Sequence, residues 1–584
     1  MTQFLNHYIL KYTPLSPIHI GTGDSYEPTN YVIDGDTLYE FDTGGAVAAF
    51  SERDRDELSK IVNGKSSEQM LKAVQKFFYD RRDQLKPWAV NAIPVLDGVI
   101  SYYFDRVKSG NKDHNKLEID RTAYNPINRQ PVLFGSSVKG AIRTALLNQT
   151  NNQQPLKLVE DRRTGKRRKE NNQELQQRLF QFRAGKFELD PLRLLQISDG
   201  NWNQQDLLPT SQILFKVNRK KELKRDKDGN EIFSQVQKNS NKGNLEILLE
   251  CIPSWRYRAF SGQLNLQQLD QLPHGVAGKL PKNDLRFNAQ QIAQSCSAFY
   301  YPILKKEMDI LRERQFIDSE WEKNIKALLS ASKDKLMSGN AFLIRVGRHS
   351  GAEAVTLNGV RNIKILEDKD AKTGKQNYSF ADQTKTLWLA ASYKEQSTNL
   401  PPFGWLLVEI VPDGQVPSDW PELQTICSGQ HQKAADWAKQ RAEQQQSFTA
   451  KRQADTQRRE REEHDRKQRE QQAQKAEQDR LAQEARAEQE RQEAEKRLAE
   501  LPPIEREMAE LLKAKKDPGK KDYLELLEAF KSGRWQAEDR QTVLVKIQQL
   551  MQQAGDWKPV TQKKDPKKDK EHLRTLELLK LLEN

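Results

Sequence analysis

The sequence is poor in the residues that build disulfide frameworks and metal sites. Its 584 residues include three cysteines, Cys251, Cys296 and Cys427, which are far apart and odd in number. Paired C-x-x-C, H-E-x-x-H and H-x-E…C-x-x-C patterns are absent, and so is the G-x-S-x-G motif of serine hydrolases. These absences disfavour a disulfide scaffold, a zinc enzyme and a hydrolase, so we expect neither a metal nor a cofactor.

Long apolar segments are missing as well. The sequence has no run of about 18 apolar residues, which a membrane-spanning helix requires. The first residues, MTQFLNHYILKYTPLSPIHIG, lack the basic start and apolar centre of a secretory signal peptide. We therefore expect a cytoplasmic protein with no membrane partner.

The charge of the chain is positive. Its 95 Lys and Arg residues exceed its 82 Asp and Glu residues, which gives a formal net charge of +13. An excess of this size is compatible with a polyanionic partner, although many ordinary proteins share it. With 36% hydrophobic and 30% charged residues the chain is polar for a wholly globular protein, which indicates an extended or solvated segment.

The composition changes near residue 430. The stretch QRREREEHDRKQREQQAQKAEQDRLAQEARAEQERQEAEKRLAEL places opposite charges four residues apart, as in Glu462 and Arg466, and such pairs stabilise a helix. We predict a charged helical stalk at 430–500, with partial disorder as the alternative. Residues 501–584 have the amphipathic pattern of helices at 504–514, 522–531, 538–554 and 573–582. They predict a small all-α domain that binds another protein.

Residues 1–425 alternate apolar runs with glycines and aromatic residues. The stretch NYVIDGDTLYEFD predicts a hairpin, because Asp-Gly lies between two alternating apolar segments. We expect helices at about 287–332 and a second hairpin, with a basic tip, in ILFKVNRKKELKRDKDGNEIFSQV. The basic stretch EDRRTGKRRKENN (160–172) predicts a mobile loop.

The stretch VLFGSSVKGAIRTALL (132–147) reads as a strand, a glycine and a helix. We expect Ser136 or Ser137, after Gly135, to cap a helix that begins at Val138. Lys139 and Arg143 share one face of that helix near its N-terminus, where N–H groups and the helix dipole favour phosphate. An ordinary capped helix with a solvated basic face is the alternative.

This stretch is not a P-loop. Gly135 and Gly140 have the spacing of G-x-x-x-x-G-K-[ST], but Ala141 and Ile142 stand where Lys and Ser or Thr are needed. Without the lysine and the metal-binding hydroxyl, a triphosphate site is excluded.

Two further stretches contain glycines beside polar groups. In SPIHIGTGDSYEPTNYVID, Gly21 and Gly23 allow close approach of the backbone, whereas His19 and Asp24 have simple explanations as a core histidine and a turn residue. In IRVGRHSGAEAVTLNGVRNIKI, basic side chains cluster around glycine turns and suit phosphate or ribose contact, with a solvated basic turn as the alternative. These side chains are Arg345, Arg348, His349 and Arg361.

Together, and in this order, the stretches PIHIGTGDSYEPTNYVIDGDTLYEFD, PVLFGSSVKGAIRTALL, DPLRLLQISD and RVGRHSGAEAVT resemble the RAMP superfamily of CRISPR-associated proteins. The sequence is most similar to the Csm-type subunit that caps the 3′ end of the guide RNA in type III effector complexes. The resemblance covers roughly residues 5–420, and the tail from about residue 430 is extra. That tail is either a fused small helical subunit of the same complex or a tether for a nuclease or accessory factor.

The resemblance implies an α+β protein with an RRM-like (ferredoxin-like) core, in which residues 1–425 form two RRM-like halves with the helical insertion at about 287–332. Such a subunit binds CRISPR RNA and target RNA and contacts the large signalling subunit and the RAMP backbone subunits. The residues expected to bind RNA are His19, Gly21, Gly23, Gly135, Ser136, Ser137, Lys139, Arg143, Arg345, Arg348, His349 and Arg361.

The resemblance also raises the question of catalysis. Related backbone subunits cut target RNA through an aspartate in the loop after the first strand, where the neighbouring ribose 2′-OH attacks. Here that loop is GDSYEPTNYVID, whose carboxylates are Asp24, Glu27 and Asp34, and Pro28 occupies about the place of the catalytic aspartate. We therefore expect a subunit without catalytic activity, and a target-RNA endonuclease that uses Asp24 is the alternative.

Overall fold

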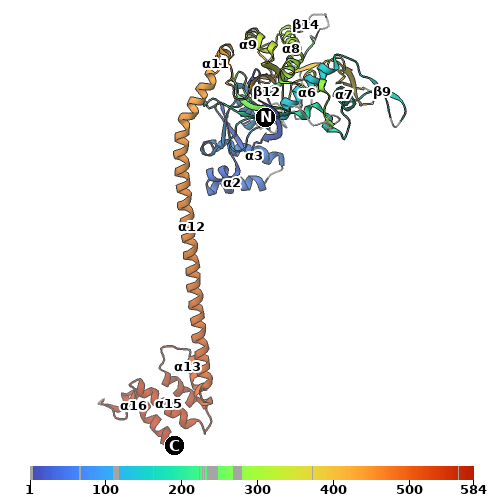
Figure 1. Ribbon diagram of the computed structural model, residues 1–584. Coiled ribbons are helices and arrows are strands. Elements are labelled where there is room, and N and C mark those ends of the chain that lie inside the picture. Colours follow the sequence, from blue (N-terminus) through green and yellow to red (C-terminus); the bar gives the residue numbers. More distant parts are fainter. Residues whose placement is uncertain are drawn as a thin grey trace. The chain divides into compact units, whose positions relative to one another are not determined.

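A computed structural model of the protein divides the chain into two units, Met1–Gln457 and Arg458–Asn584 (Figure 1). The structure describes residues 4–64, 67–108, 117–161, 164–222, 224–225, 228, 231–232, 248–267, 279–370, 373–429, 431–562 and 565–583.

The larger sheet of the first unit joins strands from both ends of that unit. Its order is β17-β21-β1-β16-β11-β7, and β10 also pairs with β16. The strands are β1 (Leu5–Pro14), β7 (Val132–Leu133), β10 (Leu195–Ile197), β11 (Gly200–Trp202), β16 (Phe260–Gln267), β17 (Ala341–Arg345) and β21 (Trp405–Pro412). β1 is antiparallel to both neighbours, so Tyr12 lies opposite Phe260 in β16 and Val408 in β21. The apolar run WLLVEIV of β21 is buried, as expected for a strand inside a core.

Two helices pack on each other and on β17: α6 (Gly135–Asn151) and α8 (Ala289–Glu313). α8 begins at a capping box, in which the side chains of Asn288 and Gln291 each accept the other's backbone N–H. Its buried face includes Ile292, Phe299 and Leu311. With α9 (Ser319–Ala331) and α10 (Lys333–Ser338) it occupies the region in which the sequence predicted helices.

Two smaller sheets complete the β-structure around this core. One has the order β2-β6-β15-β12-β20, with β6 and β15 parallel and the other pairs antiparallel. Its strands are β2 (Gly21–Tyr26), β6 (Ile119–Thr122), β12 (Gln212–Lys220), β15 (Leu248–Cys251) and β20 (Thr386–Ala391). The other contains β3 (Tyr31–Asp34), β4 (Thr37–Glu40) and β5 (Asn91–Pro94). The hairpin predicted at the Asp-Gly pair is confirmed, since Asp34 pairs with Thr37 and Gly35 takes a positive φ of 58°.

The remaining helices of the first unit are α1 (Thr43–Ala49), α2 (Glu52–Asn63), α3 (Ser67–Asp80), α4 (Arg82–Leu85), α5 (Asp97–Lys108), α7 (Asn172–Leu179) and α11 (Pro421–Ser428). The short 3-10 helices among the described residues of this unit are η1 (Lys86–Trp88), η2 (Phe187–Leu189), η3 (Pro191–Leu194), η5 (Asn283–Leu285) and η6 (Ala352–Val355).

The described residues of this unit also form three two-stranded ribbons: β8 (Leu158–Glu160) with β9 (Arg167–Lys169), β13 (Lys224–Arg225) with β14 (Glu231–Ile232), and β18 (Ile363–Lys369) with β19 (Gln376–Ala381). The prediction of a mobile basic loop at 160–172 is wrong for its described residues. They form part of the β8–β9 ribbon and the start of α7, and Arg168 is paired with Glu174 at 2.7 Å. The predicted second hairpin falls partly outside the described residues.

The long charged helix is α12 (Gln432–Glu500), drawn in orange in Figure 1. Its first turns are not a solvated stalk, because they pack on the three-stranded sheet. Trp437 Nε1 donates to Thr37 Oγ1 at 2.8 Å, and Phe448 meets the Tyr39 ring edge-on, with 6.4 Å between ring centroids. Ala438, on the same helix, is buried.

Further along α12 the charged side chains face solvent. Residues 461–497 are exposed throughout, as expected from a charge pattern without an apolar stripe. Ion pairs at the four-residue spacing occur here, with Glu463 Oε1 at 2.8 Å from Lys467 Nζ and Arg466 Nε at 3.7 Å from Glu470 Oε1. Such pairs stabilise an exposed helix that has no packing partner of its own.

The described part of the second unit beyond α12 consists of helices: α13 (Pro503–Lys513), α14 (Asp522–Lys531), α15 (Arg540–Gln553), η7 (Pro566–Lys568) and α16 (Lys570–Glu583). Their apolar faces meet in a separate core, in which Leu526, Val543, Ile547 and Leu578 are fully buried. These helices lie where the amphipathic pattern predicted them.

Helices and strands are mixed through the first unit, so the mixed α/β character expected from the sequence is confirmed. The two RRM-like halves remain a prediction. In the described part of the chain, no helix has both the length and the hydropathy that a membrane span needs.

Candidate nucleic-acid interface

Three segments that are distant in the sequence meet in one groove of the first unit. They are the start of β2, the first turns of α6 and the segment that follows β17, and the groove has a volume of about 540 Å³. Each segment belongs to one of the glycine-containing stretches singled out in the sequence. The predicted RNA-binding residues that line the groove are Gly21, Ser136, Ser137, Arg345 and Arg348.

A glycine turn joins two of these segments. Arg348 N donates to the carbonyl oxygen of His19 at 2.9 Å. Gly347 has a φ of 81°, and a Cβ there would lie 2.5 Å from the same oxygen. Only glycine fits this position, because another residue would be strained and would also collide with backbone. The turn therefore fixes Arg348 beside Gly21.

The prediction of a serine cap on α6 is wrong. The helix begins at Gly135 with Phe134 as its N-cap residue, whose side chain makes no capping hydrogen bond. Instead, Asp199 Oδ1 accepts the N–H of Gly135 at 2.7 Å from the turn between β10 and β11. The hydroxyl of Ser136 is thus not used as a cap, and Ser136 is exposed.

Asp199 changes the electrostatics expected at this helix end. Its carboxylate already occupies the side of the N-terminus at Gly135, where an anion would otherwise be favoured. The N–H groups of Ser137 and Val138 are directed to the carbonyl of Phe134, at 2.9 and 3.3 Å. An RNA phosphate would therefore find fewer free amides here than the sequence suggested.

Lys139 and Arg143 do not line the groove. Lys139 Nζ donates to the carbonyl of Leu195 at 2.8 Å, and burial lowers the pKa of this lysine. Arg143 Nη1 pairs with Asp190 at 3.0 Å, and its guanidinium lies over the ring of Phe180. The two residues share a helix face as predicted, but that face packs against other parts of the unit.

Arg348 is the predicted cation that reaches solvent in the groove. Its side chain is 52% exposed, and its Nη1 pairs with Asp120 Oδ2 of β6 at 2.8 Å. Asp120 is only 11% exposed and also lies 3.7 Å from Lys216 Nζ. The ion pair orients the guanidinium, and its Nε and Nη2 groups make no hydrogen bond to the described residues, so they can meet a ligand.

The two predicted histidines are core residues. His19 is fully buried and its Nδ1 lies 2.8 Å from the carbonyl of Glu250, whereas its Nε2 has no hydrogen-bond partner among the described residues. Burial lowers the pKa of His19. His349 packs between Trp388 and Phe403, and burial, with the charge of Lys216, lowers its pKa to about 3. Both imidazoles are neutral near pH 7, so neither supplies a positive charge for phosphate.

Two of the predicted arginines are held inside the fold. Arg345 Nη1 pairs with Glu307 at 2.9 Å, and both side chains are 5% exposed. Its Nε donates to the carbonyl of Phe403 at 2.8 Å. Arg361 donates to the carbonyl of Glu353 and to Thr356, and it does not line the groove. Arg345 therefore shapes the groove wall without offering an unpaired charge.

Gly135 and Gly23 have different surroundings. Gly135 is buried, and a Cβ there would lie 2.6 Å from the carbonyl oxygens of Ile197 and Ser198, so this glycine lets α6 approach β10. Gly23 is exposed in β2 with a φ of 92°, inside the irregular pairing between Gly21 and Ser25. Neither lines the groove.

The carboxylates near β2 differ in environment. Asp24 is exposed, and its backbone N–H bonds to Thr22 Oγ1 at 3.2 Å. Asp34 pairs with Arg82 at 2.8 Å and Lys86 at 2.6 Å, and although burial opposes it, these partners lower its pKa. Asp34 is thus committed to the fold, and Asp24 remains the accessible carboxylate of the pair.

Sequence reasoning missed three acidic residues that organise the site: Asp120, Asp199 and Glu307. Asp199 lies in the stretch DPLRLLQISD, which was recognised as part of the family pattern but given no role. Each carboxylate meets its partner only through the fold, because the partners are far away in the sequence. Glu307 lies among charged residues in the stretch KKEMD, so the sequence itself gives no signal that it is buried opposite an arginine.

This chain is similar to known proteins. The family model of the RAMP superfamily matches residues 11–347. A chain of the Csm–crRNA–target RNA ternary complex in a type III-A CRISPR-Cas system is 15% identical; the match covers 69% of this chain and 100% of that one, with a TM-score of 0.38. Csm5 of T. onnurineus is 15% identical over 68% of this chain and 99% of its own, with a TM-score of 0.36. No curated protein matches the sequence.

Proposed function

The chain belongs to the RAMP superfamily, and from this membership we propose that it is a non-catalytic RNA-binding subunit of a type III CRISPR effector complex. In this proposal the subunit holds the backbone of the guide RNA near its 3′ end. The observation that carries the proposal is the groove in which the glycine-containing stretches meet.

The chemistry of the groove suits a sugar–phosphate backbone. Gly21, Gly140 and Gly347 line it without side chains, so a strand can approach the protein backbone closely. The hydroxyls of Ser136 and Ser137 can donate to phosphate or ribose oxygens. Such contacts carry no base information, which fits a subunit that leaves sequence recognition to base pairing.

Arg348 supplies the charge. Because Asp120 holds one side of the guanidinium, its remaining N–H groups are oriented in advance and lose less freedom when they meet a phosphate. Lys139 and Arg143, which we expected to bind phosphate, are not needed for this arrangement.

In the same proposal, the subunit contacts the large signalling subunit and RAMP backbone subunits and meets target RNA within the complex. The helices from α13 to α16 serve as a protein-interaction module.

The test is the substitution Arg348→Ala in the full chain. We expect the dissociation constant for guide RNA to rise roughly tenfold, because a charge-assisted hydrogen bond to phosphate is lost. The slope of log affinity against log salt should also fall by about one counterion. Arg193→Ala is the matched control, since Arg193 is exposed and lies outside the groove. Equal affinities for the two variants would refute the groove as the RNA site.

A target-RNA endonuclease is the second candidate, because Asp24 is exposed and lies near Gly21 of the groove. Asp24→Ala and the neighbouring control Glu27→Gln would be compared in the reconstituted complex. Our proposal expects the same target-RNA cleavage with both. Loss of one cleavage site with Asp24→Ala alone, while guide RNA stays bound, would establish the endonuclease instead.

A further inference from the structure

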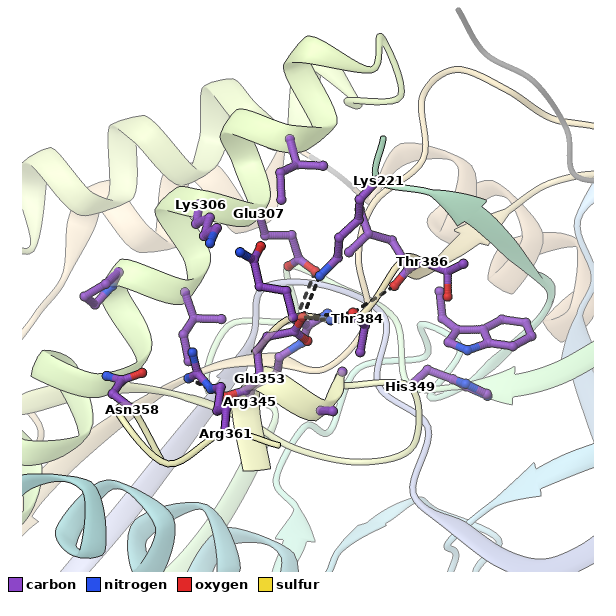
Figure 2. A pocket seen from close by; sticks show the side chains of 18 of the residues that line it. Lys221, Lys306, Glu307, Arg345, His349, Glu353, Asn358, Arg361, Thr384 and Thr386 are labelled. Atoms are coloured by element: carbon purple, nitrogen blue, oxygen red, sulfur yellow. Dashed lines mark hydrogen bonds and ion pairs between the residues drawn. The ribbon is translucent and has the colours of Figure 1, made fainter. Parts of the chain in front are cut away.

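The segment that follows β17 lines a second cavity as well as the groove. This pocket has a volume of about 400 Å³ and is bounded by α8, η6, β20 and Lys221, the residue that follows β12 (Figure 2). Arg345 lines both the pocket and the groove. The volume falls within the range of about 300–1,000 Å³ that small-molecule sites occupy.

Two ion pairs fix the walls of the pocket. Lys221 Nζ lies 2.6 Å from Glu353 Oε1, which also accepts the N–H and the hydroxyl of Thr384 at 2.7 and 2.8 Å. Burial alone would raise the pKa of Glu353, but Lys221 and Thr384 lower it to about 2. The second pair joins Glu307 to Arg345. Each carboxylate of the pocket thus has its own cation.

Two other cations that line the pocket, Arg361 and Lys306, have no ion pair with a described residue. Arg361 donates its hydrogen bonds to neutral oxygens, namely Thr356 Oγ1 at 3.2 Å and the carbonyls of Glu353 and Thr356. Lys306, on α8, is exposed at the pocket and has no ion pair with a described residue. Among the described residues, the pocket therefore has a net positive charge that an anionic group would neutralise.

The opposite side of the pocket is aromatic. Figure 2 shows Lys306, Asn358 and Arg361 on one side and His349 on the other. His349 stacks obliquely on Trp388, with 5.1 Å between ring centroids, and Trp388 also lines the pocket. The site therefore has a cationic end and an aromatic end.

We propose that this pocket binds a single nucleotide, with its phosphate at Lys306 and Arg361 and its base on the side of Trp388. The hydroxyls of Thr384 and Thr386 lie among the lining groups and can meet polar edges of the base. Aromatic side chains stack on any base, so several bases should bind.

Other small ligands match the pocket less well. A divalent cation would be repelled by the unpaired positive charges, and inorganic phosphate would leave the aromatic side unused. An apolar molecule would leave Lys306 and Arg361 without an anion. The nucleotide itself has two possible sources: a free nucleotide, or the terminal nucleotide of an RNA strand. The inference does not depend on the guide RNA assignment, because the free nucleotide requires no strand in the groove.

Binding is measured by titration calorimetry on the full chain with AMP, GMP, CMP and UMP, and with adenosine and inorganic phosphate as partial probes. We expect the nucleotides to bind more tightly than either partial probe. The substitution Lys306→Glu should weaken AMP binding roughly tenfold or more, because it replaces an attractive contact by a repulsive one. Lys305→Glu is the control: Lys305 is exposed on the same helix but does not line the pocket. It should change AMP affinity less than about twofold, as expected for an exposed charge that is screened by solvent and does not line the pocket.

The aromatic end is tested by Trp388→Leu, which should weaken AMP binding more than phosphate binding. If that variant unfolds, the AMP affinities of Lys306→Glu and Lys305→Glu still test the proposal, since both positions are on the surface. Absence of AMP, GMP, CMP and UMP binding, or equal affinities in the two lysine variants, would overturn the proposal.

A competition experiment separates the two sources. Linear and circular RNAs of the same sequence are bound to the chain and challenged with AMP. If AMP weakens the binding of the linear RNA but not of the circular RNA, the pocket binds a strand end. If AMP weakens the binding of neither RNA, the pocket binds a free nucleotide. The same two affinities separate the groove from the pocket. Loss of RNA affinity in Arg348→Ala with unchanged AMP binding would support the groove as the RNA site and the pocket as a separate site. Loss of AMP binding in Lys306→Glu with unchanged RNA affinity would support the pocket as a nucleotide site without bearing on the groove.

Discussion

Replacing Gly135 by alanine should destabilise the first unit, whereas the same replacement at Gly140 should stabilise it. Both glycines are in α6, so the change in intrinsic helix propensity is favourable at each position. They differ in what surrounds them. A Cβ on Gly135 would lie 2.6 Å from the carbonyl oxygens of Ile197 and Ser198, and a Cβ on Gly140 would have no heavy atom within 4 Å.

The expected magnitudes follow from these surroundings. The carbonyls opposite Gly135 cannot move freely, because Ile197 is paired with β16 and Ser198 N donates to Gln263 O at 3.0 Å. Overpacking against such backbone costs about 1–3 kcal/mol. Displacing Gly135 also weakens its bond to Asp199, worth about 1 kcal/mol. Alanine in place of glycine gains about 1 kcal/mol of helix propensity at both positions, so Gly135→Ala should lose about 1–3 kcal/mol in total, whereas Gly140→Ala should gain about 1 kcal/mol.

Urea denaturation of the full chain, followed by circular dichroism, measures the two variants against the parent. The transition of the first unit is the one to compare, because a chain of two units does not unfold in a single two-state step. Guide RNA affinity is measured in parallel, since a methyl on Gly140 enters the groove. A Gly135→Ala variant as stable as the parent, or a Gly140→Ala variant less stable than it, would refute the packing described here.

Three further predictions concern stability and local order. Glu307→Ala should destabilise the chain by about 3–5 kcal/mol, because it leaves the buried charge of Arg345 without an anion, whereas Glu313→Ala on the same helix should have little effect in urea denaturation. Because the folded-state pKa of His349 is lowered to about 3, its contribution to stability is complete above its ordinary pKa of 6.5 and is lost as the pH falls toward 3, by up to about 1.4 kcal/mol per pH unit. His349→Gln should reduce this pH dependence of the free energy of unfolding, and an unchanged slope of that free energy against pH would contradict the prediction. Trp437→Ala, which removes the bond to Thr37, should make the first turns of α12 more sensitive to limited proteolysis, and equal cleavage rates would contradict the docking of this helix.

Local patterns in the sequence predicted several elements well. The Asp-Gly pair at 34–35 predicted the hairpin of β3 and β4, because its φ requirement and the apolar alternation on either side are local properties. The helices from α13 to α16 followed from amphipathic spacing for the same reason. The three glycine-containing stretches singled out in the sequence meet in one groove, and their role in binding RNA stays a prediction.

Local sequence patterns could not predict which residues the charged side chains contact. Lys139 and Arg143 share a helix face, but the sequence does not show whether that face meets water or protein, and here it meets Leu195 and Asp190. The basic character of Arg345 was equally visible, whereas its neutralisation by Glu307 depends on how α8 packs on β17. Of the predicted cations, Arg348 is exposed in the groove, whereas Lys139, Arg143 and Arg361 do not line it.

We propose that this chain holds guide RNA in a type III CRISPR effector complex. Mass spectrometry and RNA sequencing of the complex purified with the native chain test it most directly. We predict small RNAs with repeat-derived sequence, together with other RAMP subunits, and a reduced yield of those RNAs with Arg348→Ala. A purified complex without repeat-derived RNA would contradict the account.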